Sequence, residues 1–248
     1  MTPLPDLPIE VRDLHKSFDG QMVLDGIDLA VRRGENVAVL GRSGAGKSVL
    51  LKTLIGLQSA DAGSIRIFGH EISNLSTAEI NRIRSHMGFL FQQAALYDSL
   101  TVEENVAFPL KRLSELPPER QQRRVRELLE AVGMDDHRHK FPSEISGGMQ
   151  KRVGLARALA LDPEIVLYDE PTAGLDPITG AEIARLILDQ ATCRQTTGIV
   201  VTHDIPATRI FADRMVLLHQ GRFVAEGTYD GLHHSRDPFV RDFLREAA

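Results

Sequence analysis

The spacing of apolar residues along the chain predicts a series of short strands. Ile27, Leu29 and Val31 alternate with polar residues, which is the period of a strand with one buried face. Other runs are almost wholly apolar, as expected for strands that are covered on both faces of a sheet. These strand candidates cover residues 36–40, 64–68, 87–91, 165–170, 198–204, 214–220 and 222–227. They leave the middle of the chain without a strand pattern.

Residues 93–161 have a helical pattern instead. One predicted helix ends near Gly133 and carries apolar residues at i, i+3, i+4 and i+7, which lie on one face of a helix. These residues are Val125, Leu128, Leu129 and Val132. Helical stretches also separate the strand candidates between residues 165 and 220.

Buried strands that alternate with helices predict an α/β fold with a mostly parallel sheet. We therefore expect one domain over residues 1–248. Its α/β core is expected to consist of residues 1–92 and 162–248, interrupted by a helical insert over residues 93–161. Residues 1–8 contain three prolines and are expected to form an unstructured arm.

Composition narrows the class of protein further. The chain has 29 Lys and Arg against 34 Asp and Glu, a net charge of −5, which argues against nucleic-acid binding by charge alone. Its single cysteine, Cys193, excludes an internal disulfide and fits a reducing compartment. We find no apolar run of the ~18 residues that cross a bilayer and no secretory signal. A cytosolic location is expected, with any membrane attachment supplied by another subunit.

The segment between the strand at 36–40 and the following helix matches G-x-x-x-x-G-K-[ST] at every fixed position. Its glycines allow consecutive backbone N–H groups to surround phosphate oxygens, and the helix N-terminus favours an anion. Lys47 is expected to bind the outer phosphates, and Ser48 to hold Mg²⁺. The alternative is a glycine-rich turn that binds nothing. The expected nucleotide contacts are Gly41, Arg42, Ser43, Gly44, Ala45, Gly46, Lys47, Ser48 and Val49.

Two acidic residues follow the apolar strand at 165–168. Asp169 is placed at the carboxyl edge of the sheet, where α/β proteins bind ligands, and is expected to hold Mg²⁺. Glu170 is placed to act as the general base that activates water. The alternative is that both residues begin a solvated turn.

A second candidate anion site precedes the helical segment 151–160, where Ser146, Gly147 and Gly148 stand at the helix entrance. With this motif, nearly the whole chain resembles the ATP-binding cassette (ABC) family of ATPases. The resemblance implies a P-loop NTPase (RecA-like) core, an N-terminal antiparallel β subdomain and an inserted α-helical subdomain. It also implies ATP and Mg²⁺ as ligands, and a head-to-tail homodimer in which Ser146, Gly147 and Gly148 contact the nucleotide held by the other protomer.

The resemblance implies roles for four further residues. Phe18 stands where an aromatic ring stacks on adenine, and Gln92 where a glutamine contacts Mg²⁺ and the attacking water. Asp176 lies in a loop that links the two active sites, and His203 stands where a histidine contacts the γ-phosphate. The alternative for Phe18 is a core residue, with stacking favoured, and a histidine such as His203 taken singly is more often structural. Gln93 leaves the glutamine register open by one.

Residues 91–110 and the segments 142–178 and 237–244 more specifically resemble the Mla-type lipid-transport ATPases. This implies that the chain energises intermembrane phospholipid transport, which maintains outer-membrane lipid asymmetry. It also implies that the chain lies at the cytoplasmic face of the bacterial inner membrane. The implied partners are a transmembrane permease, an MCE-domain protein and a STAS-domain subunit, with no nucleic acid. Residues 94–109 are expected to contact the permease, or else to be core of the insert. A small-solute importer and a non-transport ATPase remain the alternatives.

The C-terminal segment predicts a short amphipathic helix that Asp237 caps and Pro238 begins. Its apolar face is expected to pack on the chain's own core or to dock on a neighbouring subunit. That face carries Phe239, Val240, Phe243 and Leu244.

Overall fold

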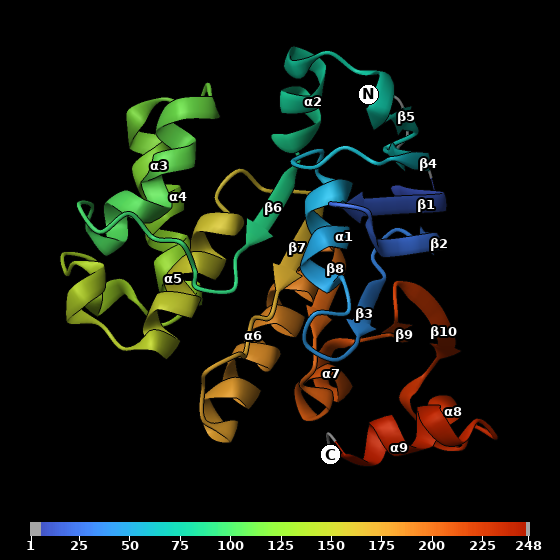
Figure 1. Cartoon of the computed structure of the whole chain (residues 1–248). Coiled ribbons are helices and arrows are strands. Elements are labelled where there is room, and N and C mark those ends of the chain that lie inside the picture. The colour runs from blue at the N-terminus through green and yellow to red at the C-terminus, as the bar shows by residue number, and fades with distance from the viewer. Residues whose placement is uncertain (1–5, 247–248) are drawn as a thin grey trace.

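The structure, a computed structural model, describes residues 6–246. Of the expected N-terminal arm, residues 1–5 lie outside the described residues, and the first strand begins at Ile9. Two sheets and two groups of helices make up the fold (Figure 1). None of the described helices is both long and apolar enough to cross a bilayer.

The smaller sheet is antiparallel and has the strand order β2-β1-β4-β5. It consists of β1 (Ile9–Phe18), β2 (Gln21–Val31), β4 (Ala62–Ile67) and β5 (His70–Glu71). This confirms the antiparallel N-terminal subdomain.

The larger sheet has the order β10-β9-β3-β8-β7-β6, and all its neighbours are parallel except the pair β9 and β10. Its strands are β3 (Asn36–Leu40), β6 (Met87–Leu90), β7 (Ile165–Asp169), β8 (Thr197–Thr202), β9 (Arg214–His219) and β10 (Arg222–Gly227). The mostly parallel core sheet is therefore confirmed.

The helices fall into two groups. Around the sheets are α1 (Lys47–Leu54), α2 (Thr77–Arg84), α6 (Pro177–Arg194), α7 (Ile205–Phe211), α8 (Tyr229–His233) and α9 (Pro238–Glu246). A second group, α3 (Val102–Leu113), α4 (Pro118–Ala131) and α5 (Gly147–Ala158), lies together beyond β6 (Figure 1). All three belong to the predicted helical insert, and the subdomain boundaries at residues 92 and 162 stay a prediction.

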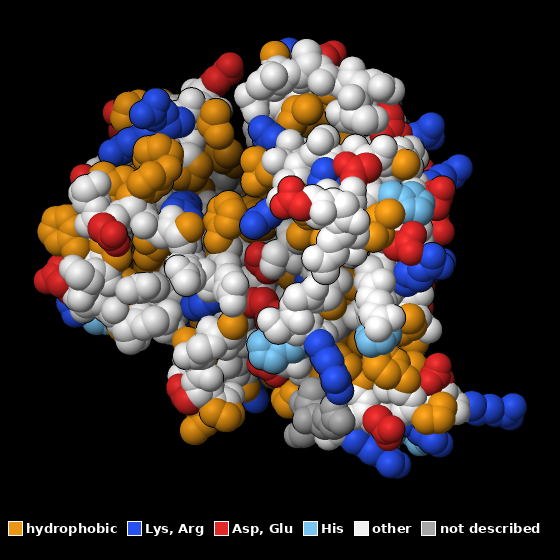
Figure 2. Space-filling model, viewed as in Figure 1, with side chains coloured by type: hydrophobic (Ala, Val, Ile, Leu, Met, Phe, Trp, Pro, Cys, Tyr) orange, Lys and Arg blue, Asp and Glu red, His pale blue; other side chains and the backbone are white. Residues whose placement is uncertain are grey.

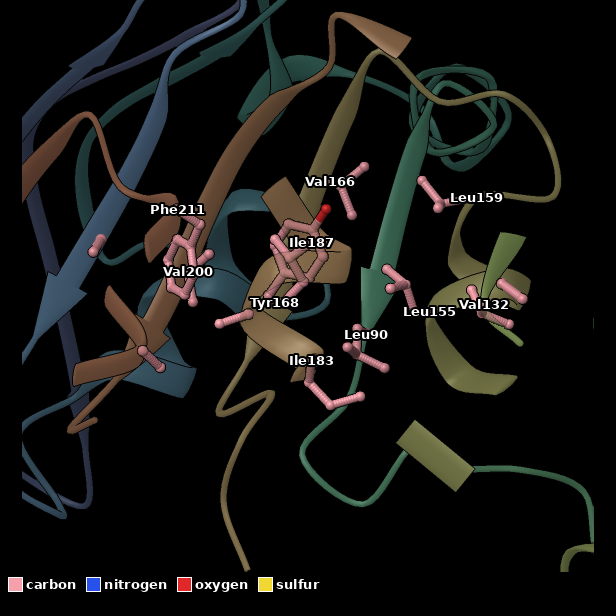
Figure 3. Packing of buried hydrophobic residues seen from close by; sticks show 14 of the residues in the cluster. Leu90, Val132, Leu155, Leu159, Val166, Tyr168, Ile183, Ile187, Val200 and Phe211 are labelled. Carbon is pink, nitrogen blue, oxygen red and sulfur yellow. The ribbon is translucent and has the colours of Figure 1, made fainter. Parts of the chain in front are cut away.

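Alternate residues of β3 show how two apolar clusters form. Val37 and Val39 face a cluster that contains α1 and the antiparallel sheet, whereas Ala38 and Leu40 face a cluster that contains α5, α6 and α7. The second cluster also includes buried residues of α3 and α4, so the helical insert shares a core with the sheet. Figure 3 shows part of this second cluster, which includes Tyr168 of β7 and Ile187 of α6.

The C-terminal helix α9 packs on the chain's own core. Asp237 caps it by accepting a hydrogen bond from the Phe239 N–H at 2.8 Å. Val240, Phe243 and Leu244 are buried in the same cluster as α7 and β9. Of the two expectations for this apolar face, packing on the chain's own core is confirmed.

Candidate active site

Residues 41–48 form a tight turn from the carboxyl end of β3 into α1. Gly46 has φ +102°, and a Cβ there would lie 2.9 Å from the carbonyl oxygen of Val23. A Cβ on Gly41 would lie 2.7 Å from the carbonyl oxygen of Leu218. Glycine is therefore required at both positions, because any side chain would force neighbouring backbone apart. Among the described residues, no side chain caps the N-terminus of α1, which keeps its N–H groups available to an anion.

This turn borders a hollow of about 530 Å³ that opens to solvent. Its described lining residues are Val23, Arg42, Ser43, Gly44, Gly46, Lys47, Ser48, Val49, Gln92, Glu170, His203 and Phe243. Residues from the ends of β3, β6, β7 and β8 therefore meet at one edge of the sheet, the edge at which α/β sheets bind ligands. Gln92 is in this lining and Gln93 is not among the described lining residues, which favours Gln92, and its contact with Mg²⁺ and water stays a prediction.

Lys47 is 6% exposed and its ammonium has three contacts. Nζ donates to the carbonyl oxygen of Gly41 at 2.7 Å and to that of Arg42 at 3.2 Å, and it lies 3.1 Å from Oε1 of Glu170. A desolvated ammonium at a phosphate loop is a strong partner for phosphate oxygens. Phosphate and Glu170 would compete for it.

A candidate magnesium site lies beside this lysine. Ser48 Oγ donates to Oδ1 of Asp169 at 2.8 Å, and Gln92 lines the same hollow. Among the described residues, no group of three or more His, Cys, Asp or Glu side chains is arranged to hold a metal alone. The donors fit Mg²⁺, which is commonly held by one or two carboxylates together with substrate phosphates. Burial raises the pKa of Asp169, and the Ser48 hydrogen bond opposes that shift.

Glu170 is placed at the centre of the site. Its side chain is 9% exposed, and Oε2 lies 2.9 Å from Nδ1 of His203, which is 63% exposed. Glu170 has φ +47°, a left-handed conformation that is costly for a residue other than glycine. Such strain is often found at functional sites, where the surrounding structure holds the side chain in position.

Sequence reasoning missed Lys151 of α5 and the contribution of Phe243 to the hollow. Lys151 is 5% exposed, and its Nζ donates to the backbone carbonyls of Gln92 and, at 3.2 Å, Glu170. Burial lowers the pKa of Lys151, while the charges of Asp169 and Glu170 oppose the shift. The sequence offers no signal for this lysine, because its partners are 59 and 19 residues away.

Phe18 lies outside the hollow's lining, at the end of β1. It is 40% exposed, with the Lys16 ammonium 5.1 Å from its ring centre, so the core alternative is wrong. An exposed ring is available for stacking, and the adenine contact stays a prediction.

The Ser-Gly-Gly motif and Asp176 also lie outside the lining. Ser146 caps α5 by accepting a hydrogen bond from the Met149 N–H, and a Cβ on Gly147 would meet no described atom within 4 Å. Asp176 caps α6 through the N–H groups of Ile178 and Thr179. The expected contacts of these residues with a second protomer's nucleotide stay predictions.

Comparison with known proteins gives relatives that are named as ATP-binding proteins of transporters. A model of the ABC transporter family matches residues 24–173. The chain is 43% identical over 236 residues to the "probable ribonucleotide transport ATP-binding protein mkl" of Mycobacterium leprae, covering 95% of this chain and 68% of that protein. It is 43% identical over 219 residues to the "methionine import ATP-binding protein MetN" of Rhizobium etli, covering 88% of this chain and 60% of that one.

Solved structures share the fold. The ATP-binding cassette MJ0796, a dimer in a post-hydrolysis state bound to ADP and Pi, superimposes with a TM-score of 0.82 at 32% identity, covering 90% of this chain and 99% of that one. The cbiO1 protein of Clostridium perfringens, part of the transporter complex cbiONQ, has a TM-score of 0.83 at 31% identity, covering 90% and 89%. With the phosphate loop, the Asp169–Glu170 pair and these relatives together, the chain belongs to the ABC transporter family and is an ATPase that binds ATP with Mg²⁺.

Proposed function

We propose that this ATPase drives transport through a separate membrane permease, as one of two copies that enclose ATP between them. ATP-binding cassettes of this family form dimers and work with a transmembrane permease. The exposed Ser146 and Gly147 support this proposal, because they are a second candidate anion site outside the described lining of the chain's own hollow. A second copy is needed to bring such a motif to the nucleotide.

The proposed chemistry converts ATP and water to ADP and phosphate. Lys47 and the N–H groups of the loop bind the outer phosphates and stabilise the charge on the transferred phosphoryl group. Glu170 accepts a proton from the attacking water, and His203 orients the Glu170 carboxylate. Ser48, Asp169 and Gln92 would hold Mg²⁺, which supplies positive charge beside the phosphates.

The observation that carries this proposal is the meeting of Lys47, Glu170 and His203 in one hollow. Lys47→Ala is expected to weaken ATP binding about 10- to 100-fold, since a charge-assisted hydrogen bond is worth ~1.5–3 kcal/mol. Titration calorimetry measures the affinity, with Lys111→Ala on the exposed side of α3 as the matched control. An unchanged affinity in Lys47→Ala would contradict the proposed role.

The proposed permease-facing surface is the segment 94–109 with its surroundings. Tyr97 is 46% exposed and its ring lies 4.7 Å from that of Phe108, whereas Val102 is fully buried. Hydrophobic side chains gather over the side of the molecule that carries α3, α4 and α5 (Figure 2). The segment thus combines core positions with an exposed aromatic surface suited to a partner.

For the cargo, the names of the relatives favour a small solute, because they describe ribonucleotide transport and methionine import. Phospholipid transport with MCE-domain and STAS-domain partners is the second candidate, supported by the resemblance of residues 91–110 and 237–244 to the Mla-type ATPases. Both place the chain peripherally at the cytoplasmic face of a bacterial inner membrane.

A deletion strain separates the two cargo proposals. Loss of uptake of a small solute, with a normal outer-membrane barrier, supports the importer. Detergent sensitivity with phospholipid in the outer leaflet supports lipid transport instead. Complementation with the wild-type gene should correct the uptake defect or the barrier defect, and complementation with Glu170→Gln should correct neither.

A further inference from the structure

We propose that Lys151 is a positioning residue that fixes the backbones of Gln92 and Glu170 relative to each other, so that hydrolysis depends on the placement of α5. This inference rests on the proposed function, because the roles of Gln92 and Glu170 in hydrolysis are taken from it. Lys151 itself lies outside the residues that line the nucleotide hollow.

The contacts of Lys151 join two neighbouring strands of the parallel sheet. Gln92 follows β6 and Glu170 follows β7, and these strands are paired up to Leu90 and Tyr168. The Lys151 ammonium donates to a carbonyl oxygen just beyond each strand end. It therefore bridges the two segments that present the candidate glutamine and the candidate base.

The burial of Lys151 argues for a function beyond packing. An ammonium that is 5% exposed loses most of its hydration, which costs several kcal/mol unless it is paired or hydrogen-bonded. An apolar residue of similar size often gives equal or greater stability at a buried charged position. Here two backbone carbonyls and the nearby carboxylates of Asp169 and Glu170 compensate the charge. These are groups of the active site.

Further contacts bind α5 firmly to the chain around Gln92. A Cβ on Gly154 would lie 2.8 Å from Leu90 Cδ1, so the helix is in close contact with β6. Arg157 donates to the carbonyl oxygens of Ala95 at 2.7 Å and Ala94 at 2.5 Å. The helix therefore contacts the chain on both sides of Gln92, and Lys151 extends this contact to Glu170.

The position of α5 places the Lys151 contacts on the same helix that follows the Ser-Gly-Gly motif. The helix begins directly after Ser146, the first residue of the Ser-Gly-Gly motif that is proposed to contact the nucleotide of a second protomer. A shift of α5 on meeting that nucleotide would move Lys151, and with it the backbones of Gln92 and Glu170. Formation of the complete dimer would then be coupled to the geometry of the base.

The test compares Lys151→Met with wild type in the full chain. Methionine keeps much of the length and removes the donor, so kcat for ATP hydrolysis is expected to fall about 10- to 100-fold, the cost of misplacing a catalytic group. The Kd for ATP, measured in the same samples, is expected to stay within about twofold, because Lys47 and its loop are untouched. Lys151→Arg, which retains charge and donors, is expected to recover part of kcat.

Arg152→Met is the matched control on the same helix. Arg152 ties α5 to Glu182 of α6 at 2.7 Å and to the carbonyl oxygen of Val132 at 3.2 Å, away from Gln92 and Glu170. Its loss is expected to lower the melting temperature and to leave kcat near wild type. Equal losses of kcat in Arg152→Met and Lys151→Met would overturn the inference, because they would show a general loosening of α5.

Wild-type kcat in Lys151→Met would also overturn the inference and leave the ATPase mechanism intact. A wild-type protein that fails to hydrolyse ATP would instead overturn the proposed mechanism and this inference with it. If Lys151→Met does not fold, Lys151→Gln replaces it, since its shorter side chain cannot span both carbonyls. An intermediate kcat is then expected, and wild-type kcat would refute the bridge.

Discussion

Glu170 uses both of its carboxylate oxygens in contacts with other side chains. Oε1 lies 3.1 Å from the Lys47 ammonium, and Oε2 lies 2.9 Å from Nδ1 of His203. A γ-phosphate that attracts Lys47 would release Oε1, which then becomes available to accept a proton from water. In the proposed mechanism, the same lysine would link substrate binding to activation of the base.

Glu170→Gln is expected to lower the rate of ATP hydrolysis by about 100-fold or more, because an amide cannot act as the base. ATP affinity is expected to stay equal or to rise, since the neutral side chain no longer competes for Lys47. Single-turnover hydrolysis and calorimetry on the same sample measure the two effects. Glu226→Gln, an exposed substitution on β10, controls for loss of charge. Near-normal hydrolysis in Glu170→Gln would exclude Glu170 as the base.

The residues of the site differ in how far sequence reveals them. Gly41–Ser48 and the Asp169–Glu170 pair are contiguous, so their chemistry is readable from order alone and the structure places them at one sheet edge. Lys151 reaches the site only through the packing of α5 on β6, which no local pattern records. Phe243 likewise reaches the hollow only because α9 folds back onto the sheet.

At the level of elements, strands with regular alternation or continuous burial are the ones that the sequence predicts. All five residues of β3 are buried, and its bounds match the predicted 36–40. The alternation of apolar and polar residues does not delimit β1. Register shifts between Val11 and Leu14 and between Leu14 and Lys16 break the period of two along this strand. Pairing with β2 and β4, rather than local propensity, stabilises β1.

Helix α9 connects the end of the chain to the nucleotide hollow through Phe243, which is 6% exposed. Phe243→Leu keeps an apolar contact with the core and removes the aromatic ring from the lining of the nucleotide hollow. It is expected to raise KM for ATP about two- to tenfold with kcat unchanged, the effect of losing an aromatic contact worth ~0.5–1.5 kcal/mol. Phe239→Leu on the same helix is the control, because Phe239 packs against His219 and is not among the described lining residues. Equal KM values for ATP in Phe243→Leu and Phe239→Leu would contradict a contact between Phe243 and the nucleotide.

For the whole molecule, the two candidate anion sites belong to separate parts of the fold, and Ser146 and Gly147 are not among the described lining residues of the hollow. Head-to-tail pairing of two copies would place each motif at the other's hollow. The positions of α1 and α5 in separate parts of the fold support this proposed arrangement.

Light scattering on Glu170→Gln with ATP is expected to give twice the chain mass of 27.4 kDa, because ATP is bound between the copies and is not cleaved. Without nucleotide, the same variant is expected to give the mass of one chain. Glu170→Gln combined with Ser146→Arg is expected to remain monomeric, since a large side chain would block the motif. A monomer of Glu170→Gln at saturating ATP would contradict nucleotide-dependent pairing.

The strand order of the larger sheet has a consequence for how the protein is made. Strand β3, which leads into the phosphate loop, pairs with β8 on one side and β9 on the other. Those partners begin at Thr197 and Arg214, so a ribosome must pass residue 197 before either edge of β3 is covered. The phosphate loop is consequently assembled late. A chain that lacks β8 and β9 leaves the apolar strand Asn36–Leu40 exposed to aggregation and to chaperones, and we expect it to gain nucleotide-binding ability only after these two strands have been made.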